Sequence, residues 1–219
     1  MILVFAKAPV PGTVKTRLIP ALGDAGAAEL HRRMVWQTLS VVAAAGEPVT
    51  LCCAPDTAHP FFVECARRFG ALLETQEGAD LGARMAHALQ GALDRGGQTT
   101  HAVLVGTDCP ALDVPTLLAA VQSLREHDYV FVPVEDGGYA LVGARRADSV
   151  AQIFTQIAWS TAEVMAQTRL RLMSRGASWQ ELATSWDVDE AADLARLSRH
   201  DAGRALLDGL FPATPFPTG

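Results

Sequence analysis

Short apolar segments that suit buried strands alternate with longer amphipathic segments that suit helices along most of this chain. The clearest strand covers residues 101–106, where Val103, Leu104 and Val105 follow one another without a polar break. Further strands are predicted at residues 1–6, 49–54, 71–75, 129–134 and 139–142. Helices are predicted at residues 24–45, 60–69, 81–93, 113–124, 160–174 and 189–197. This alternation predicts an α/β fold, in which helices cover both faces of a mostly parallel sheet.

Polar residues mark the expected starts of several helices. Asp24 and Asp113 are predicted N-caps, and Ser160 with Glu163 has the spacing of a capping box. Prolines and a glycine within residues 7–20 predict a loop between the first strand and the first helix.

The composition is that of an ordinary globular protein. Of the 219 residues, 49% are hydrophobic and 19% are charged, which suits one domain over residues 1–210 with a poorly ordered Pro-rich tail at 211–219. The formal net charge of −6 argues against nucleic acid as the main partner, because a long phosphate backbone needs a basic surface. A small phosphorylated ligand needs only a few local cations, so this class of ligand stays compatible with the charge.

The absence of a recognisable targeting signal and the pattern of the cysteines both predict a cytoplasmic protein. The N-terminus has no basic leader, and no apolar stretch approaches the roughly 20 residues that a membrane helix needs. We therefore expect no membrane partner. The four cysteines form no C-x-x-C pair, so we expect buried free thiols, with Cys52 and Cys53 on opposite faces of a strand.

Three cations gather in the loop that directly follows the first predicted strand. They are Lys7, Lys15 and Arg17, of which Lys15 and Arg17 could supply the charge and the forked donors that a pyrophosphate requires. Prolines such as Pro9 stiffen the loop, and Gly12 lets the backbone approach a phosphate closely. The alternative is an ordinary solvated loop. The position after a strand favours a phosphate site, although the loop is neither a Walker A motif nor a Rossmann G-x-G-x-x-G.

A carboxylate, Asp108, follows the clearest strand, at the edge of the sheet where ligands bind in parallel folds. It could hold Mg²⁺ or Mn²⁺ while phosphate oxygens fill other coordination positions. The alternative is that Asp108 only caps the next turn. Because Asp113 is the better cap for the following helix, we favour a metal ligand. The neighbouring Cys109 has no histidine nearby in sequence to activate it, so we expect it to serve packing.

The five residues Glu135, Asp136, Gly137, Gly138 and Tyr139 have two interpretations of equal weight. Paired glycines beside two acidic residues suit a simple hairpin turn. They equally suit a loop that faces the acceptor of a transfer reaction.

Two alternate carboxylates, Asp187 and Asp189, share one face of a segment that is predicted to be extended. They could complete a metal site, or Asp189 could cap the helix that follows. The six histidines are scattered without ligand spacing, so we expect them at ordinary surface or core positions.

Taken together, six ordered blocks resemble the bacterial glycosyltransferase-like proteins that are associated with radical-SAM and selenium-domain genes. The blocks are residues 5–18, 80–85, 106–110, 135–139, 159–161 and 187–189. The resemblance implies a GT-A-like fold, the three-layer α/β/α sandwich of nucleotide-diphospho-sugar transferases. This fold is also similar to that of nucleotidyltransferases such as the 2-phospholactate and molybdenum-cofactor guanylyltransferases.

The resemblance also implies roles for individual residues. The implied nucleotide-binding residues are Lys7, Pro9, Gly12, Lys15, Arg17, Asp80 and Arg84, with Asp80 and Arg84 bordering the nucleoside. The implied metal ligands are Asp108 and either Asp187 or Asp189, and the implied acceptor-facing residues are Asp136, Gly137, Gly138 and Tyr139. Lys15, Arg17 and Asp108 would carry the catalysis.

The expected function is a transferase that depends on Mg²⁺ or Mn²⁺ and uses a nucleotide-activated small-molecule donor, above all a nucleotide sugar, with an acceptor still to be identified. The closest alternative is a nucleotidyltransferase that releases pyrophosphate. A nucleotide-binding module without turnover is the alternative from another class, but an acceptor loop and a second carboxylate favour catalysis. The sequence is also compatible with a homodimer.

Overall fold

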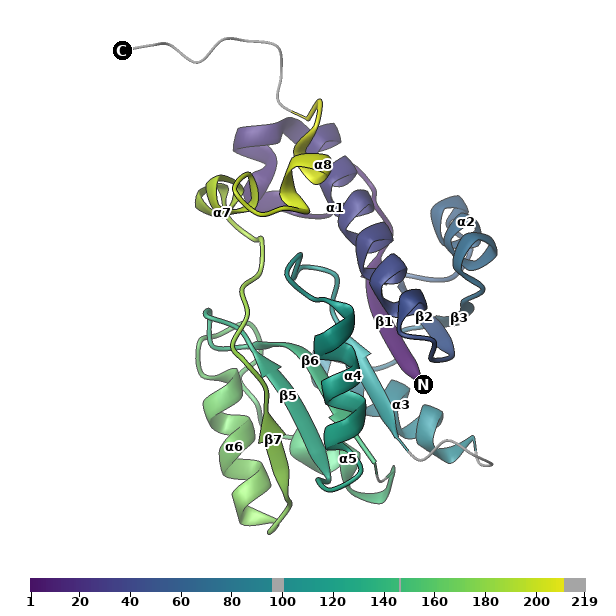
Figure 1. Ribbon diagram of the computed structural model, residues 1–219, viewed down its shortest axis with the longest axis vertical. Helices are drawn as coiled ribbons and strands as arrows, with labels where there is room; N and C mark the ends of the chain where they lie inside the picture. The colour runs from purple at the N-terminus through teal and green to yellow at the C-terminus, as the bar shows by residue number, and fades with distance from the viewer. Residues whose placement is uncertain (96–100, 146, 211–219) are drawn as a thin grey trace.

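The sheet at the centre of the molecule is mostly parallel, as predicted (Figure 1). The computed structural model describes residues 1–95, 101–145 and 147–210, and within them one sheet has the strand order β3-β2-β1-β4-β6-β5-β7. The strands are β1 (Ile2–Lys7), β2 (Val49–Ala54), β3 (Leu72–Thr75), β4 (Ala102–Val105), β5 (Tyr129–Pro133), β6 (Tyr139–Ala144) and β7 (Trp179–Glu181). Strand β6 runs antiparallel to its neighbours β4 and β5, whereas the other neighbouring strands are parallel.

Helices cover both faces of this sheet, so the predicted three-layer α/β/α arrangement is confirmed. The helices are α1 (Ile19–Ala44), α2 (Pro60–Phe69), α3 (Leu81–Asp94), α4 (Val114–Ser123), α5 (Ala147–Ile153), α6 (Val164–Ser174), α7 (Ala191–Leu197) and α8 (Gly203–Leu207). Helices α1, α2 and α4 pack on one face, and α3, α5 and α6 pack on the other. A short 3-10 helix, η1 (Thr16–Leu18), leads into α1.

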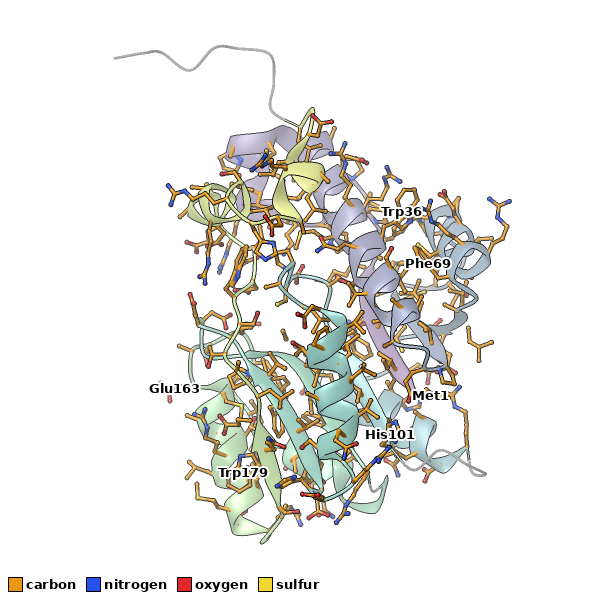
Figure 2. The ribbon with its side chains drawn as sticks, viewed as in Figure 1. Met1, Trp36, Phe69, His101, Glu163 and Trp179 are labelled. Carbon is orange, nitrogen blue, oxygen red and sulfur yellow. The ribbon has the colours of Figure 1, made fainter. Side chains whose placement is uncertain are left out.

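Alternation along the strands sends neighbouring side chains into two separate hydrophobic cores. Cys53 lies in the core beneath α1, α2 and α4, and Cys52 lies in the core beneath α3, α5 and α6, which confirms that the two thiols point to opposite faces. Figure 2 shows Trp36 and Phe69 at the edge of the first core, where α1 meets α2. Because each fully buried large apolar side chain contributes about 1.5–3 kcal/mol, both cores hold the sheet in place.

A third, smaller core anchors the C-terminal part of the chain beside the start of α1. Leu30 of α1 packs there with Leu194 of α7 and Leu206 of α8, and Figure 1 shows these helices together at one end of the molecule. Trp186 and Val188 belong to the same core. The segment that leads into α7 is therefore fixed next to the loop that follows β1.

The predicted helix starts are correct where a side chain caps the helix and wrong where the backbone turns differently. Asp113 caps α4 and accepts a backbone hydrogen bond at 2.9 Å, as predicted. Helix α1 begins before Asp24, but Gly23 has φ +70° and interrupts it, so the helix resumes at Asp24. The predicted capping box is wrong, because Ser160 lies in a turn with φ +63° and α6 begins after Glu163.

Three short elements, α5, β7 and α8, were not predicted. They contain seven, three and five residues, too few for a periodic apolar pattern to stand out. The predicted Pro-rich tail, residues 211–219, lies outside the described residues. No helix in the described part of the chain is both long and apolar enough to cross a membrane.

Candidate active site

Two adjoining cavities lie at the edge of the sheet where β1 and β4 end and β6 begins. Their volumes are about 560 and 530 Å³, and because Asp108 lines both of them they form one cleft. Lys7 and Lys15 line only the second cavity, which we call the basic half. Asp136 and Asp187 line only the first, which we call the acidic half. The cleft thus occupies the edge that the strand order predicts for a ligand.

Lys15 joins three separate segments at the floor of the cleft. It adopts φ +48°, an uncommon conformation for a residue other than glycine, directly before η1. Its ammonium lies 2.6 Å from Asp108 Oδ1 and donates to the Val188 carbonyl oxygen at 2.6 Å. The Val188 amide in turn donates to the Asp108 carbonyl oxygen at 2.9 Å. The loop after β1, the loop after β4 and the segment before α7 therefore meet at Lys15.

The ion pair between Lys15 and Asp108 is buried on one side and open on the other. The Lys15 side chain is 5% exposed, whereas 51% of the Asp108 side chain is open to the cleft. The surrounding protein raises the pKa of Asp108, but the charge and the hydrogen bond of Lys15 outweigh this, so the pKa lies below its usual value. Asp108 is therefore an ionised carboxylate that faces the cleft.

The other residues of the first loop lie at different depths. Lys7 ends β1 and lines the basic half. Arg17 lies at the rim with 66% of its side chain exposed, and it donates to Asp189 Oδ2 at 2.8 Å. Pro9 and Gly12 line neither cavity, and Gly12 has φ +78°, which a turn in this loop requires. The structure therefore brings the three predicted cations to the cleft, while Pro9 and Gly12 shape the loop.

The predicted nucleoside-binding pair, Asp80 and Arg84, lies outside the walls of both cavities. Asp80 caps α3 by accepting a backbone hydrogen bond at 2.7 Å, and Arg84 donates to the carbonyl oxygen of Gly78 at 3.2 Å. Leu81 and Met85 of the same helix line both cavities instead. Asp80 thus fixes the start of α3, and through it the apolar residues that face the cleft.

The two candidates for the second metal carboxylate differ in their surroundings. Asp187 is half-buried in the acidic half, where burial, and then the nearby Asp136 carboxylate, raise its pKa to about 6. The Asp108 carboxylate contributes to the same upward shift. Asp189, by contrast, is already paired with Arg17.

The donor chemistry of this site fits a hard divalent cation, because Asp108 and Asp187 present carboxylate oxygens to one cavity. As they stand, no three His, Cys, Asp or Glu side chains of the described residues are grouped closely enough to hold a metal ion. Lys15 also occupies one oxygen of Asp108. A metal would therefore need Asp108, Asp187 and further oxygens from a ligand such as a diphosphate.

The predicted acceptor loop is a tight hairpin between β5 and β6 whose residues also line the acidic half. Gly137 has φ +91°, and a Cβ there would overlap the Ala162 carbonyl oxygen. Asp136 Oδ1 accepts from the Gly138 amide at 2.8 Å, which closes the turn. Asp136, Gly138 and Tyr139 line the cavity, and burial raises the pKa of the Tyr139 hydroxyl above its usual value. The segment is therefore a hairpin turn, as one of the two interpretations of the sequence predicted, and its residues also line a cavity.

Several residues of the cleft were missed by sequence reasoning. His31 Nε2 lies 3.0 Å from the Lys7 carbonyl oxygen, and burial lowers the pKa of this histidine although the Asp108 charge opposes the shift. Gln76 Nε2 donates to the carbonyl oxygen of Cys52 at 2.8 Å and lines the basic half. His31 is buried on α1 among apolar residues, so nothing in the sequence distinguished it from a core residue.

Cys109 lies in the wall of the acidic half, but its environment suits packing. Its Sγ is 2.9 Å from Ser185 Oγ, and burial raises the pKa of the thiol. A thiol with a raised pKa is a poor nucleophile at neutral pH, because little thiolate forms. All four cysteines are free and buried, as expected.

Comparisons with known proteins agree with the fold. A family model described as "Uncharacterized protein conserved in bacteria (DUF2064)" matches residues 38–161. A solved structure from Desulfovibrio desulfuricans G20, whose name assigns it to the nucleotide-diphospho-sugar transferases, is 32% identical with a TM-score of 0.82. That match covers 94% of this chain and 92% of the other. No curated protein matches the chain.

Two more distant structures share the fold alone. A nucleotidyl transferase from Methanothermobacter thermautotroptrophicus is 14% identical with a TM-score of 0.59, over 90% of this chain and 95% of that one. The 4-diphosphocytidyl-2C-methyl-D-erythritol synthase of Anaerococcus prevotii DSM 20548 is 10% identical with a TM-score of 0.58, over 91% of this chain and 99% of that one.

Proposed function

This chain belongs to the DUF2064 family of bacterial proteins, and from that kinship and the geometry of the cleft we propose that it is a metal-dependent glycosyltransferase with a nucleotide-sugar donor. The observation that carries the proposal is the division of charge within one cleft. Lys7 and Lys15 line the basic half, Asp136 and Asp187 line the acidic half, and Asp108 lines both. The basic half suits the diphosphate of a donor, and the acidic half is the place for an acceptor.

The basic half suits a diphosphate, because its cations are already placed. Lys7 and Arg17 can donate charge-assisted hydrogen bonds to phosphate oxygens. The Lys15 ammonium has three N–H donors and uses two of them, on Asp108 and Val188, so the third can be directed at the ligand. Cations held in place in this way stabilise the negative charge that develops on a departing diphosphate.

In the proposed reaction a hydroxyl oxygen of the acceptor bonds to the anomeric carbon of the donor sugar. The bond from that carbon to the diphosphate oxygen breaks, and the nucleoside diphosphate leaves with the electron pair. The hydroxyl proton passes to a carboxylate of the acidic half, for which Asp136 lies on the acceptor loop. A divalent cation held by Asp108 and Asp187 would supply further positive charge beside the leaving group.

Nucleotidyl transfer is the second candidate, because nucleotidyltransferases share this fold. The same basic half would then hold a nucleoside triphosphate, and the products would be a nucleoside monophosphate adduct and pyrophosphate. Product identity separates the two reactions.

The test is an incubation of the protein with a panel of nucleotide sugars and nucleoside triphosphates, with Mg²⁺ or Mn²⁺, read by mass spectrometry. Free nucleoside diphosphate indicates glycosyl transfer, and pyrophosphate indicates nucleotidyl transfer. Binding is measured in parallel by thermal melting, where a ligand at 100 times its dissociation constant stabilises the fold by about 2.7 kcal/mol. If no nucleotide raises the melting temperature with either metal, the proposal is wrong.

A matched pair of variants locates the binding. Lys7→Ala should weaken nucleotide affinity by about one to two orders of magnitude, because a charged hydrogen bond is lost. Arg67→Ala removes an exposed cation of α2 that lines neither cavity and should leave affinity unchanged.

A further inference from the structure

The acidic half of the cleft contains far more negative than positive charge. Among the described residues that line it, the carboxylates are Asp108, Asp136, Asp187 and Asp189, and the cation is Arg17. Arg17 is already paired with Asp189 at 2.8 Å. Asp108 is likewise paired with Lys15 at 2.6 Å, so among the described residues Asp136 and Asp187 are the lining carboxylates that have no ion-pair partner. A phosphate or carboxylate group on an acceptor would therefore meet repulsion from Asp136 and Asp187, whereas hydroxyl and ammonium groups would be attracted to them.

An aromatic side chain forms a fixed part of the same wall. Trp159 lines the acidic half, and its indole packs so closely on α3 that a Cβ at Gly82 would lie 2.6 Å from the ring. Its ring also contacts Phe154 at a centroid distance of 6.2 Å. Trp159 therefore adds an aromatic surface to the cavity wall, which suits contact with the C–H groups of a sugar ring or with an ammonium group.

Hydrogen-bonding groups of the wall complete the match. An ionised carboxylate only accepts hydrogen bonds, so Asp136 selects ligand groups that donate them, such as hydroxyl and ammonium groups. The hydroxyl-bearing residues Ser160 and Thr161 follow Trp159 in the same wall. The wall is held in place by the hairpin, because the backbone of Gly137 packs directly against Ala162.

We propose that the acidic half binds a non-phosphorylated acceptor that carries hydroxyl or ammonium groups and stacks on Trp159, and that it rejects acceptors bearing phosphate. This inference rests on the proposed function, because it assigns the acceptor of the same site. It also separates the two candidate reactions: a nucleotidyl transfer that builds a diphosphate product needs a phosphate on the acceptor. Asp136 is then the residue that determines the charge of the acceptor.

The experiment has two arms, so that the two proposals can fail separately. The first arm measures the melting temperature with nucleoside diphosphates and Mg²⁺ and tests only the nucleotide site. The second arm measures acceptor binding by calorimetry, with the best nucleoside diphosphate of the first arm present, or without nucleotide if none binds. Its probes are glucose, galactose, mannose, glucosamine, glycerol and ethanolamine, each compared with its phosphorylated counterpart.

The expected result is that at least one unphosphorylated probe binds and that its phosphorylated counterpart binds at least about tenfold more weakly, as expected when an ionic hydrogen bond is replaced by repulsion. Equal or tighter binding of the phosphorylated members would overturn the inference, and so would an absence of binding by every probe. A nucleotide shift in the first arm together with either of these results overturns the inference and leaves the proposed function standing.

Charge reversal gives a matched control. Asp136→Lys should abolish or reverse the preference for an unphosphorylated probe over its phosphorylated counterpart. The rise in melting temperature caused by a nucleoside diphosphate in the first arm should remain. Glu163→Lys makes the same change in net charge at an exposed residue outside the cavity, which Figure 2 shows at the start of α6, and it should keep the preference. Trp159→Ala should weaken the affinity for the probe that binds by about tenfold. Trp159→Phe retains an aromatic ring and should keep much of that affinity. An unchanged preference in Asp136→Lys would overturn the role of Asp136.

Discussion

The ammonium group of Lys15 lies 2.6 Å from Asp108 Oδ1, and the lysine side chain is almost completely enclosed while the aspartate remains open to the cleft. This pair holds the loops that follow β1 and β4 together. Lys15 therefore has a structural role in addition to its proposed role at the diphosphate.

The first prediction separates these two roles of the loop cations. Lys15→Ala should lower the free energy of unfolding of the ligand-free protein by about 1–3 kcal/mol, because Asp108 and the Val188 carbonyl lose a buried donor. Arg17→Ala should cost less than about 1 kcal/mol, because its ion pair with Asp189 is exposed. Urea unfolding of both variants measures the difference. Equal losses would contradict the structural role of Lys15.

The second prediction concerns the second metal carboxylate. Asp187→Asn should raise the dissociation constant of Mn²⁺, in the presence of nucleoside diphosphate, by about tenfold or more, as should Asp108→Asn. Asp189→Asn should change it little, because that carboxylate is engaged by Arg17. Electron paramagnetic resonance of free Mn²⁺ reports the binding directly. If only Asp189→Asn weakened Mn²⁺ binding, then Asp189 and not Asp187 would be the second metal carboxylate.

The third prediction uses two glycines with different surroundings. Gly137→Ala should destabilise the protein by about 2–4 kcal/mol, since the residue has a positive φ and its new Cβ would overlap Ala162. Gly91 lies within α3, and a Cβ added there would meet open space, so Gly91→Ala should stabilise the protein by about 0.5–1 kcal/mol. Thermal melting shows whether each variant is less or more stable than the unaltered protein. A neutral Gly137→Ala would mean that the hairpin does not press on the wall of the cavity.

The fourth prediction links stability to pH at the other end of the sheet. Partial burial raises the pKa of Asp128, but hydrogen bonds from the Ser178 amide and hydroxyl and from Arg145 outweigh it, so the pKa lies below its usual value. Because the pKa is depressed in the folded state, the contribution is complete above the unfolded pKa of about 3.9 and is lost as the pH falls through the folded pKa.

Asp128→Asn should therefore cost about 1–2 kcal/mol at pH 7, and the difference from the unaltered protein should shrink as the pH falls below about 3.9. Urea unfolding across this range measures both quantities. A constant difference between the two proteins at every pH would show that the charge of Asp128 is not involved.

The sequence predicted those parts of the fold that depend on local patterns. Helix α2, residues Pro60–Phe69, was placed correctly because a proline precedes its apolar face and Gly70 follows with φ +65°. Strand β2, residues Val49–Ala54, was correct because all six of its residues are buried and nearly all are apolar. The capping box predicted at Ser160 was wrong because the spacing that makes such a box also occurs in a turn.

The candidate site was predictable in location but not in its contacts. Lys15 and Asp108 each follow a strand, and parallel strands bring such residues to one edge. The contact between Lys15 and Val188 left no trace in the sequence, because its acceptor is a main-chain carbonyl that any residue would provide. Trp159 and Gly82 are likewise far apart in sequence, and only packing shows that one requires the other to be small.

The hydrogen bond from Lys15 to Val188 spans 173 positions of the chain. During synthesis, the cation loop and the strands around it emerge from the ribosome long before the segment that receives this bond. The cleft is therefore completed late in translation, and a product that stops before Val188 carries both loops without the contact that joins them. A fragment of this kind would therefore have an incomplete cleft, even though the strands β1 to β6 are all present in it.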